Sequence, residues 1–186
     1  MKERNYWPLF FIAIFAFTVY MIIWTIIQAM NAPVIEDRSF MQKYQYVDEN
    51  YNDIMNANID FLEKYKLELN LNGKIFPLTT EDIKFGQRVI EKYSQHKDNL
   101  KIGENSILLT VTEINTQKTI PINFDILITK TMTNENDIDL NSKEFKEDNG
   151  VYSSNFIISE KTNWIITGKI KTEDKEGYIF IKTNAR

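Results

Sequence analysis

The sequence contains no cysteine and only one histidine, His96, among its 186 residues. Without cysteine there can be no disulfide bond, no thiolate nucleophile and no thiolate metal ligand. A copper site would need histidine, cysteine or clustered methionine at ligand spacing, and the six methionines are scattered along the chain. We therefore expect no metal site and no bound cofactor. His96, between Gln95 and Lys97, is interpreted as a solvated loop residue.

Basic residues are fewer than acidic ones: the chain has 22 lysines and arginines and 26 aspartates and glutamates, which gives a net charge of −4. An acidic surface is unsuited to binding nucleic acid, so we expect no nucleic-acid partner. A Ser–His–acid arrangement would have to be built around His96, in a segment of lysine, glutamine and aspartate. Adjacent carboxylates are interpreted as helix-start or solvated charges; these are Glu36/Asp37, Asp48/Glu49 and Glu81/Asp82. The sequence predicts no catalytic residue and a protein that is not an enzyme.

One long run, from Pro8 to Met30, carries no charge at all. At about 1.5 Å per residue it would measure roughly 34 Å as a helix, enough for a hydrocarbon core of about 30 Å. A cleaved signal peptide has a shorter apolar region of about 7–15 residues and small residues before the cleavage site. Cleavage after Ala32 would instead place Met30 at the third position before the bond and Pro33 directly after it. We predict a retained transmembrane helix over residues 8–30.

The flanks of this run indicate an orientation. Lys2 and Arg4 precede it, and basic residues favour the cytoplasmic side of a membrane. The prediction is therefore a cytoplasmic N-terminus over residues 1–7 and a C-terminal part on the periplasmic side of a bacterial cytoplasmic membrane. Tyr6 and Trp7 lie at one end of the span, where aromatic rings settle at headgroup level.

Polar side chains gather on one stripe of the predicted span. Residues at successive steps of three and four are Phe11, Ile14, Thr18, Met21, Thr25 and Gln28. Three of the six are polar, Thr18, Thr25 and Gln28. Lipid offers their hydroxyl and amide groups no hydrogen-bond partner, whereas a neighbouring helix does, at on the order of 0.6 kcal/mol per bond. The candidate contact with a partner helix is therefore Thr18, Met21, Thr25 and Gln28, and the opposite side, with Phe10, Phe17 and Ile27, would face lipid. The open alternative is that the threonines bond to their own backbone and that Gln28 reaches interfacial water.

A membrane-proximal helical region is expected over residues 34–65. Pro33 interrupts the first helix, and Ser39-Phe40-Met41-Gln42 has the form of a capping box that would start another. Apolar residues then recur at steps of three and four from Phe40 to Tyr65, which predicts one amphipathic helix of about 25 residues.

Residues 66–186 have the pattern of a single antiparallel β-sandwich, so the fold class is a single-pass membrane protein of the α+β type. Residues 66–71 alternate, and Asn72-Gly73 is a strong hairpin signal before Lys74–Pro77. Residues 79–96 fit either a helix or a bent strand, which leaves the topology of residues 66–99 open. Later strands are predicted at Ser106–Glu113, Ile120–Lys130, Val151–Ser159, Asn163–Lys171 and Gly177–Thr183, with a turn-prone stretch over 134–149. We expect Tyr152 and Trp164 to belong to the structural core.

Four segments of this β region resemble the periplasmic domain of the FixH family: NLKIGENSILLTVTE, IPINFDILI, NGVYSSNFII and TNWIITGKI. The matching features are the L-x-x-G-x-N spacing from Leu100 to Asn105, a Gly150-x-Tyr152 turn into a strand, and Trp164 opening the next strand. The resemblance implies an immunoglobulin-like sandwich related to the YtkA-like modules.

The same resemblance implies a role as a membrane-anchored accessory or assembly subunit of cbb3-type cytochrome c oxidase in a bacterial respiratory chain, acting beside a copper-transporting ATPase. Oxidase subunits would then be the partners, met through the transmembrane helix and the membrane-proximal helix. The alternative is an exported single-pass binding module, or envelope-complex subunit, unrelated to respiration, whose span is only a tether.

Overall fold

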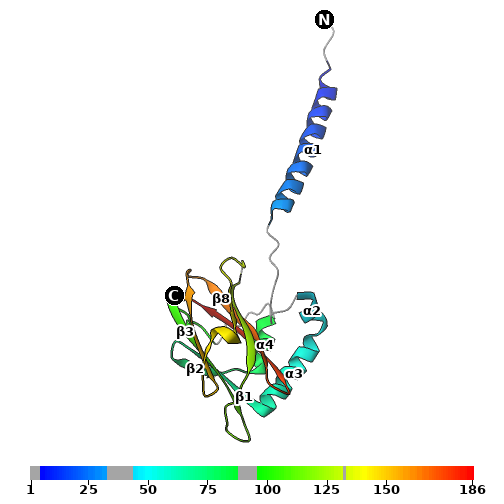
Figure 1. Cartoon of the computed structure of the whole chain (residues 1–186). Helices are drawn as coiled ribbons and strands as arrows, with labels where there is room; N and C mark the ends of the chain where they lie inside the picture. The colour runs from blue at the N-terminus through cyan, green and yellow to red at the C-terminus, as the bar shows by residue number, and fades with distance from the viewer. Residues whose placement is uncertain (1–4, 33–43, 88–95, 132) are drawn as a thin grey trace. The chain divides into compact units, whose positions relative to one another are not determined.

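The computed structural model describes residues 5–32, 44–87, 96–131 and 133–186. The chain divides into two compact units, Met1–Ile35 and Glu36–Arg186. The first unit contains helix α1, and the second contains all the strands and the remaining helices (Figure 1). The expected capping box at Ser39 and the helix start at Phe40 lie outside the described residues.

Helix α1 runs from Trp7 to Asn31 and has a proline in its first turn. Proline is tolerated there because its missing N–H would have no partner within the helix. Within the described residues, α1 is the one helix long and apolar enough to cross a membrane. The rings of Trp7, Phe10 and Phe11 cluster at its start, with centroids 5.9–6.1 Å apart.

The helix expected to continue unbroken up to Tyr65 is divided in two. Helix α2 spans Tyr44–Glu49 and helix α3 spans Tyr51–Lys64, and Asn50 between them has φ −109° and ψ 17°. The Asn50 side chain donates from Nδ2 to the Tyr46 carbonyl at 2.9 Å. The Tyr46 carbonyl also keeps its helical hydrogen bond from the Asn50 backbone N–H, at 3.0 Å. The break is therefore a change in the backbone angles of Asn50, a residue type of low helix propensity, and not the loss of this bond. The prediction of a single helix was wrong at this point.

The strands of the second unit form two antiparallel sheets. The first has the strand order β2-β1-β3-β7-β6 and the second the order β5-β4-β8-β9. The first sheet comprises β1 (Tyr65–Leu71), β2 (Lys74–Pro77), β3 (Gly103–Glu113), β6 (Lys146–Asp148) and β7 (Val151–Ile158). The second comprises β4 (Asn123–Lys130), β5 (Ile138–Asn141), β8 (Asn163–Lys171) and β9 (Glu176–Asn184). The expected combination of one N-terminal apolar helix with antiparallel sheets is thus confirmed.

The hairpin predicted at Asn72-Gly73 is present. Leu71 pairs with Lys74, and Asn72 and Gly73 have φ values of 53° and 86°. Two central residues with positive φ identify a type I′ turn, whose twist matches that of the flanking strands. The turn therefore fixes the β1–β2 register, as the sequence indicated.

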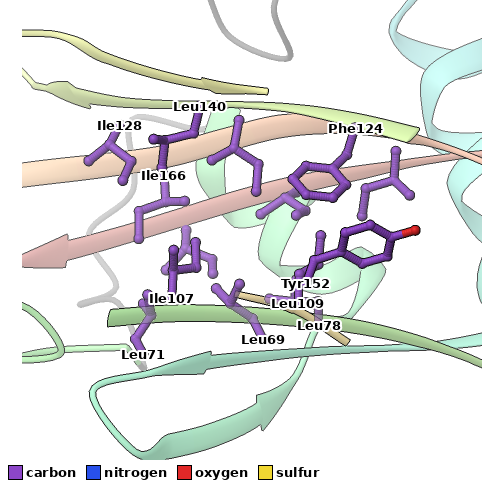
Figure 2. Close-up of a cluster of buried hydrophobic side chains, with 14 of the residues drawn as sticks. Leu69, Leu71, Leu78, Ile107, Leu109, Phe124, Ile128, Leu140, Tyr152 and Ile166 are labelled. Carbon is purple, nitrogen blue, oxygen red and sulfur yellow. The ribbon is translucent and has the colours of Figure 1, made fainter. Parts of the chain in front are cut away.

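The main core lies between the two sheets. In β1 the residues Leu67, Leu69 and Leu71 are at most 1% exposed, whereas the intervening side chains are half-buried. Figure 2 shows Leu69, Leu71, Ile107, Leu109 and Tyr152 of the first sheet facing Phe124, Ile128, Leu140 and Ile166 of the second. Alternate side chains along the strands of both sheets therefore point into one shared core.

A second cluster attaches the helices to the outer side of β8 and β9. Its buried members are Val47, Ile54, Met55, Ile83, Tyr178 and Phe180. Helix α4 (Thr80–Gln87) and α3 both pack against β9. The apolar side chains of α2 and α3 in this cluster are thus covered by the domain's own second sheet.

Two loop assignments needed correction. The stretch 134–149, expected to be a turn, contains β5, the short 3-10 helix η2 (Ser142–Glu144) and β6. Leu140 and Phe145, 8% and 7% exposed, anchor it in the core, and two apolar residues among many polar ones gave too weak a periodic signal. Strand β4 begins at Asn123 rather than Ile120, after Pro121, which cannot donate a ladder hydrogen bond.

Candidate interaction surfaces

The polar stripe of α1 is largely satisfied by the helix itself. Thr18 Oγ1 donates to the Ile14 carbonyl at 2.9 Å, and Thr25 Oγ1 donates to the Met21 carbonyl at 2.8 Å. Both hydroxyl donors are thus used within the helix, as in the alternative that the sequence left open. Of the candidate contact, the thioether of Met21 and the amide of Gln28 are the side-chain groups that remain to favour a neighbouring helix.

An open pocket of about 510 Å³ lies where the end of α3, the start of β1 and the β2–α4 connection meet. Its apolar lining includes Leu62, Tyr65 and Leu78, and Thr79 and Thr112 add hydroxyl groups. The volume falls within the range of ligand pockets, about 300–1,000 Å³. Lys66 is the charged residue of the lining, which includes no aspartate, glutamate or histidine.

His96 lies in a loop, as expected, but the interpretation that its side chain is solvated is wrong. Its Nε2 atom lies 2.6 Å from Oδ1 of Asp82, and the two side chains are 15% and 16% exposed. Asp82 also accepts hydrogen bonds from the Thr79 N–H and hydroxyl at 2.9 and 3.0 Å. The pair connects the first turn of α4 to the chain that leads into β3, across a sequence separation of 14 residues.

The electrostatics of Asp82 follow from these contacts. Burial disfavours its charged form, yet the hydrogen bonds from His96 and Thr79 outweigh burial and hold the pKa of Asp82 below its ordinary value. A carboxylate at the first turn of a helix is also favoured by the helix dipole. The expectation that Glu81/Asp82 are helix-start charges describes the position of both, since both lie in the first turn of α4.

A charged cluster closes the corner between α3, β1 and the β8–β9 turn. Asp174 accepts from Lys64 Nζ at 2.8 Å and from the Tyr65 hydroxyl at 2.7 Å. These two hydrogen bonds lower the pKa of Asp174 to about 2. The hydrogen bond to Asp174 likewise raises the pKa of Lys64 above its ordinary range. The cluster joins α3 and β1 to the turn between β8 and β9.

The L-x-x-G-x-N motif has a structural role in this chain. Gly103 has φ 95°, a conformation that favours glycine. Asn105 is 1% exposed, and its Oδ1 accepts from the Lys101 N–H while its Nδ2 donates to the Lys101 and Gly103 carbonyls. Leu100 is buried as well. The three motif positions together shape the loop that enters β3.

Tyr152 and Trp164 are 5% and 1% exposed. The Tyr152 hydroxyl accepts from the Ile122 N–H at 3.1 Å, and Trp164 Nε1 donates to the Glu160 carbonyl at 3.3 Å. Each buried aromatic ring therefore has its polar atom satisfied. Lys130, whose Nζ lies 6.0 Å from the Trp164 ring centroid, pairs with Glu160 at 2.7 Å.

Within residues 5–32, 44–87, 96–131 and 133–186, no group of three or more histidine, cysteine, aspartate or glutamate side chains is arranged to hold a metal ion. The contacts that sequence reasoning missed, such as Asp82 with His96, join segments whose proximity no local pattern reveals. No protein-family model matches this chain, and neither does any curated protein.

Proposed function

We propose that this protein is a non-catalytic, membrane-anchored accessory subunit or assembly factor of cbb3-type cytochrome c oxidase. In this proposal α1 crosses the bacterial cytoplasmic membrane with its N-terminus in the cytoplasm, and the second unit is a periplasmic immunoglobulin-like sandwich. The partners are oxidase subunits, contacted through α1 and the helices that follow it. The basis is the sequence resemblance to the FixH family.

The observation that carries the proposal is the joining of one uncharged helix of 25 residues to a two-sheet domain. The two-sheet domain has its own buried core, built from residues of the second unit. An exposed helix of this composition is costly in water and favourable in a bilayer. The L-x-x-G-x-N motif, with Gly103 and Asn105 shaping the loop into β3, supports the resemblance on which the oxidase assignment rests.

Deleting the gene tests the proposal. The expected result is a lower amount of assembled, haem-containing cbb3-type oxidase in the membrane, with other periplasmic complexes unchanged. Restoring the full chain should restore the oxidase, whereas residues 33–186 exported without α1 should not. Normal oxidase activity in the deletion strain would refute the proposed function.

A second candidate function is an exported binding module for which α1 is only a tether. The internal hydrogen bonds of Thr18 and Thr25 favour it, because they remove most of the polar attraction that a specific partner helix would satisfy. Replacing α1 by an unrelated transmembrane helix distinguishes the two candidates. A normal amount of assembled oxidase with the foreign helix would support the hypothesis that α1 is only a tether. Loss of oxidase assembly would support a specific role for α1.

A further inference from the structure

The sequence contains two Asn-Gly pairs, Asn72-Gly73 and Asn149-Gly150, and each forms a hairpin turn. Asparagine before glycine can deamidate, because the glycine N–H is unhindered. The glycine nitrogen attacks Cγ of the asparagine, a new N–C bond forms, and ammonia leaves with the side-chain nitrogen. Water then opens the resulting succinimide at either carbonyl and leaves aspartate or isoaspartate.

At Asn72-Gly73 both the side-chain amide of Asn72 and the N–H of Gly73 form hydrogen bonds in the folded protein. The Asn72 amide nitrogen donates to the Asn99 carbonyl and to Asn105 Oδ1 at 2.9 and 2.8 Å. Its Oδ1 accepts from the Ser106 N–H at 3.1 Å. The attacking nitrogen, Gly73 N, donates to Asn70 Oδ1 at 2.9 Å. Ring closure would break all four bonds, so the fold protects this site.

Asn149 is held much less firmly. Its side chain is exposed, and its Nδ2 donates to the neighbouring carboxylate of Asp148 at 2.8 Å. The Asn149 backbone carbonyl accepts from Thr119 Oγ1 at 2.9 Å, and Gly150 is buried against Thr119. These contacts restrain the main chain of the turn and do not involve the Asn149 side-chain amide. Both residues of the turn have positive φ, 51° for Asn149 and 79° for Gly150.

We propose that Asn149 is a deamidation site of the folded protein and that Asn72 is not. The product has a consequence for the first sheet, because the turn joins β6 to β7 over only three residue pairs. Isoaspartate adds a methylene to the main chain between the paired residues Asp148 and Val151. Either product also places a second negative charge beside Asp148, so ageing loosens β6 from the edge of the sheet.

The test is to age the purified full-length chain in mild detergent at mildly alkaline pH, and to follow both sites by mass spectrometry. Tryptic peptides 67–74 and 147–161 each contain one Asn-Gly pair, and electron-transfer fragmentation separates aspartate from isoaspartate. We expect conversion at Asn149 to exceed conversion at Asn72 severalfold. The control is the same chain in denaturant, in which both pairs should convert at similar rates.

Equal rates in the folded chain, faster conversion at Asn72, or no conversion at Asn149 while the denatured chain converts would each overturn the proposal. The variant Asn70→Ala provides a second test, because it releases the attacking Gly73 nitrogen without touching the Asn149 turn. Conversion at Asn72 should rise in this variant and conversion at Asn149 should stay unchanged. An unchanged ratio would contradict the protection assigned to the hydrogen bonds around Asn72.

Discussion

The buried side chain of Asn58 in α3 accepts a hydrogen bond at 2.9 Å from the backbone N–H of Tyr178 in β9, across a separation of 120 residues. The same side chain donates to Thr80 Oγ1 at the start of α4, at 3.4 Å. One amide therefore links α3 to the edge strand of the second sheet and to α4.

Replacing Asn58 with alanine should destabilise the domain by about 1–3 kcal/mol, the cost of removing the acceptor of a buried backbone N–H. Denaturant unfolding of the full chain in detergent would measure this loss. The matched control is Asn56→Ala, on the exposed side of the same helix, which should stay within about 0.5 kcal/mol of the parent. Similar values for the two variants would contradict the assigned role of Asn58.

Gly177 should not tolerate a side chain. A Cβ there would lie 2.8 Å from ring carbons of Phe61, which is fully buried. Overpacking of this kind costs about 1–3 kcal/mol, so Gly177→Ala should lower the midpoint of denaturant unfolding.

Gly168→Ala offers a graded comparison, because its Cβ would lie 2.6 Å from the Asp125 carbonyl oxygen. A backbone atom in a hydrogen-bonded strand can move away from a new methyl group less easily than an aromatic ring can. We therefore expect Gly168→Ala to be the more destabilising of the two substitutions, and the reverse order would show that the Phe61 ring is the more rigid neighbour.

Stability should fall in acid partly through Asp174. Its pKa is lowered from 3.8 to about 2 in the folded protein by the hydrogen bonds from Lys64 and Tyr65. A lowered pKa means that the folded state favours the charged form, so this contribution is complete above pH 3.8 and is lost as the pH falls towards 2.

The variant Asp174→Asn should flatten the pH dependence of unfolding in that window. Unfolding midpoints across a pH series would show the difference, with Asp60→Asn on the exposed side of α3 as the control. If the unfolding midpoint of Asp174→Asn falls with pH as steeply as that of the parent in this window, the charge of Asp174 does not contribute to the stability of the folded state.

Local pattern accounts for much of the fold. The alternation in β1 and the Asn72-Gly73 turn depend on neighbours in sequence, and both could be predicted from the residues. The break at Asn50 was missed because the spacing of apolar residues continues across it, while the change is in the backbone angles of that one residue. The spacing of apolar residues indicates which face of a helix is buried, and it carries no information on the backbone angles of a single residue.

The contacts outside the core were not predictable from the sequence. Asp82 with His96 and Asn58 with Tyr178 each join separate elements, and their distances depend on how the helices pack on the second sheet. For the candidate contact in α1, the sequence located the polar stripe but could not decide where the hydroxyl protons point. That choice determines how much the stripe can attract a partner.

Because Thr18 and Thr25 donate hydrogen bonds within α1, the prediction for contact with a partner helix now depends mainly on Gln28. If α1 packs against an oxidase helix, Gln28→Leu alone should weaken copurification with the oxidase roughly threefold, at on the order of 0.6 kcal/mol for one interhelical hydrogen bond. Adding Thr18→Leu and Thr25→Leu should change little more. The control is leucine at Phe10, Phe17 and Ile27, and if both sets of variants behave alike the helix is only a tether.

The most direct measurement for the proposed function is affinity purification of the tagged full-length chain from membranes in mild detergent, with mass spectrometry and a haem absorption spectrum of the eluate. The proposed function predicts recovery of cbb3-type oxidase subunits together with haem absorption, and loss of both when α1 is replaced by an unrelated transmembrane helix. An eluate free of haem and of oxidase subunits would contradict it.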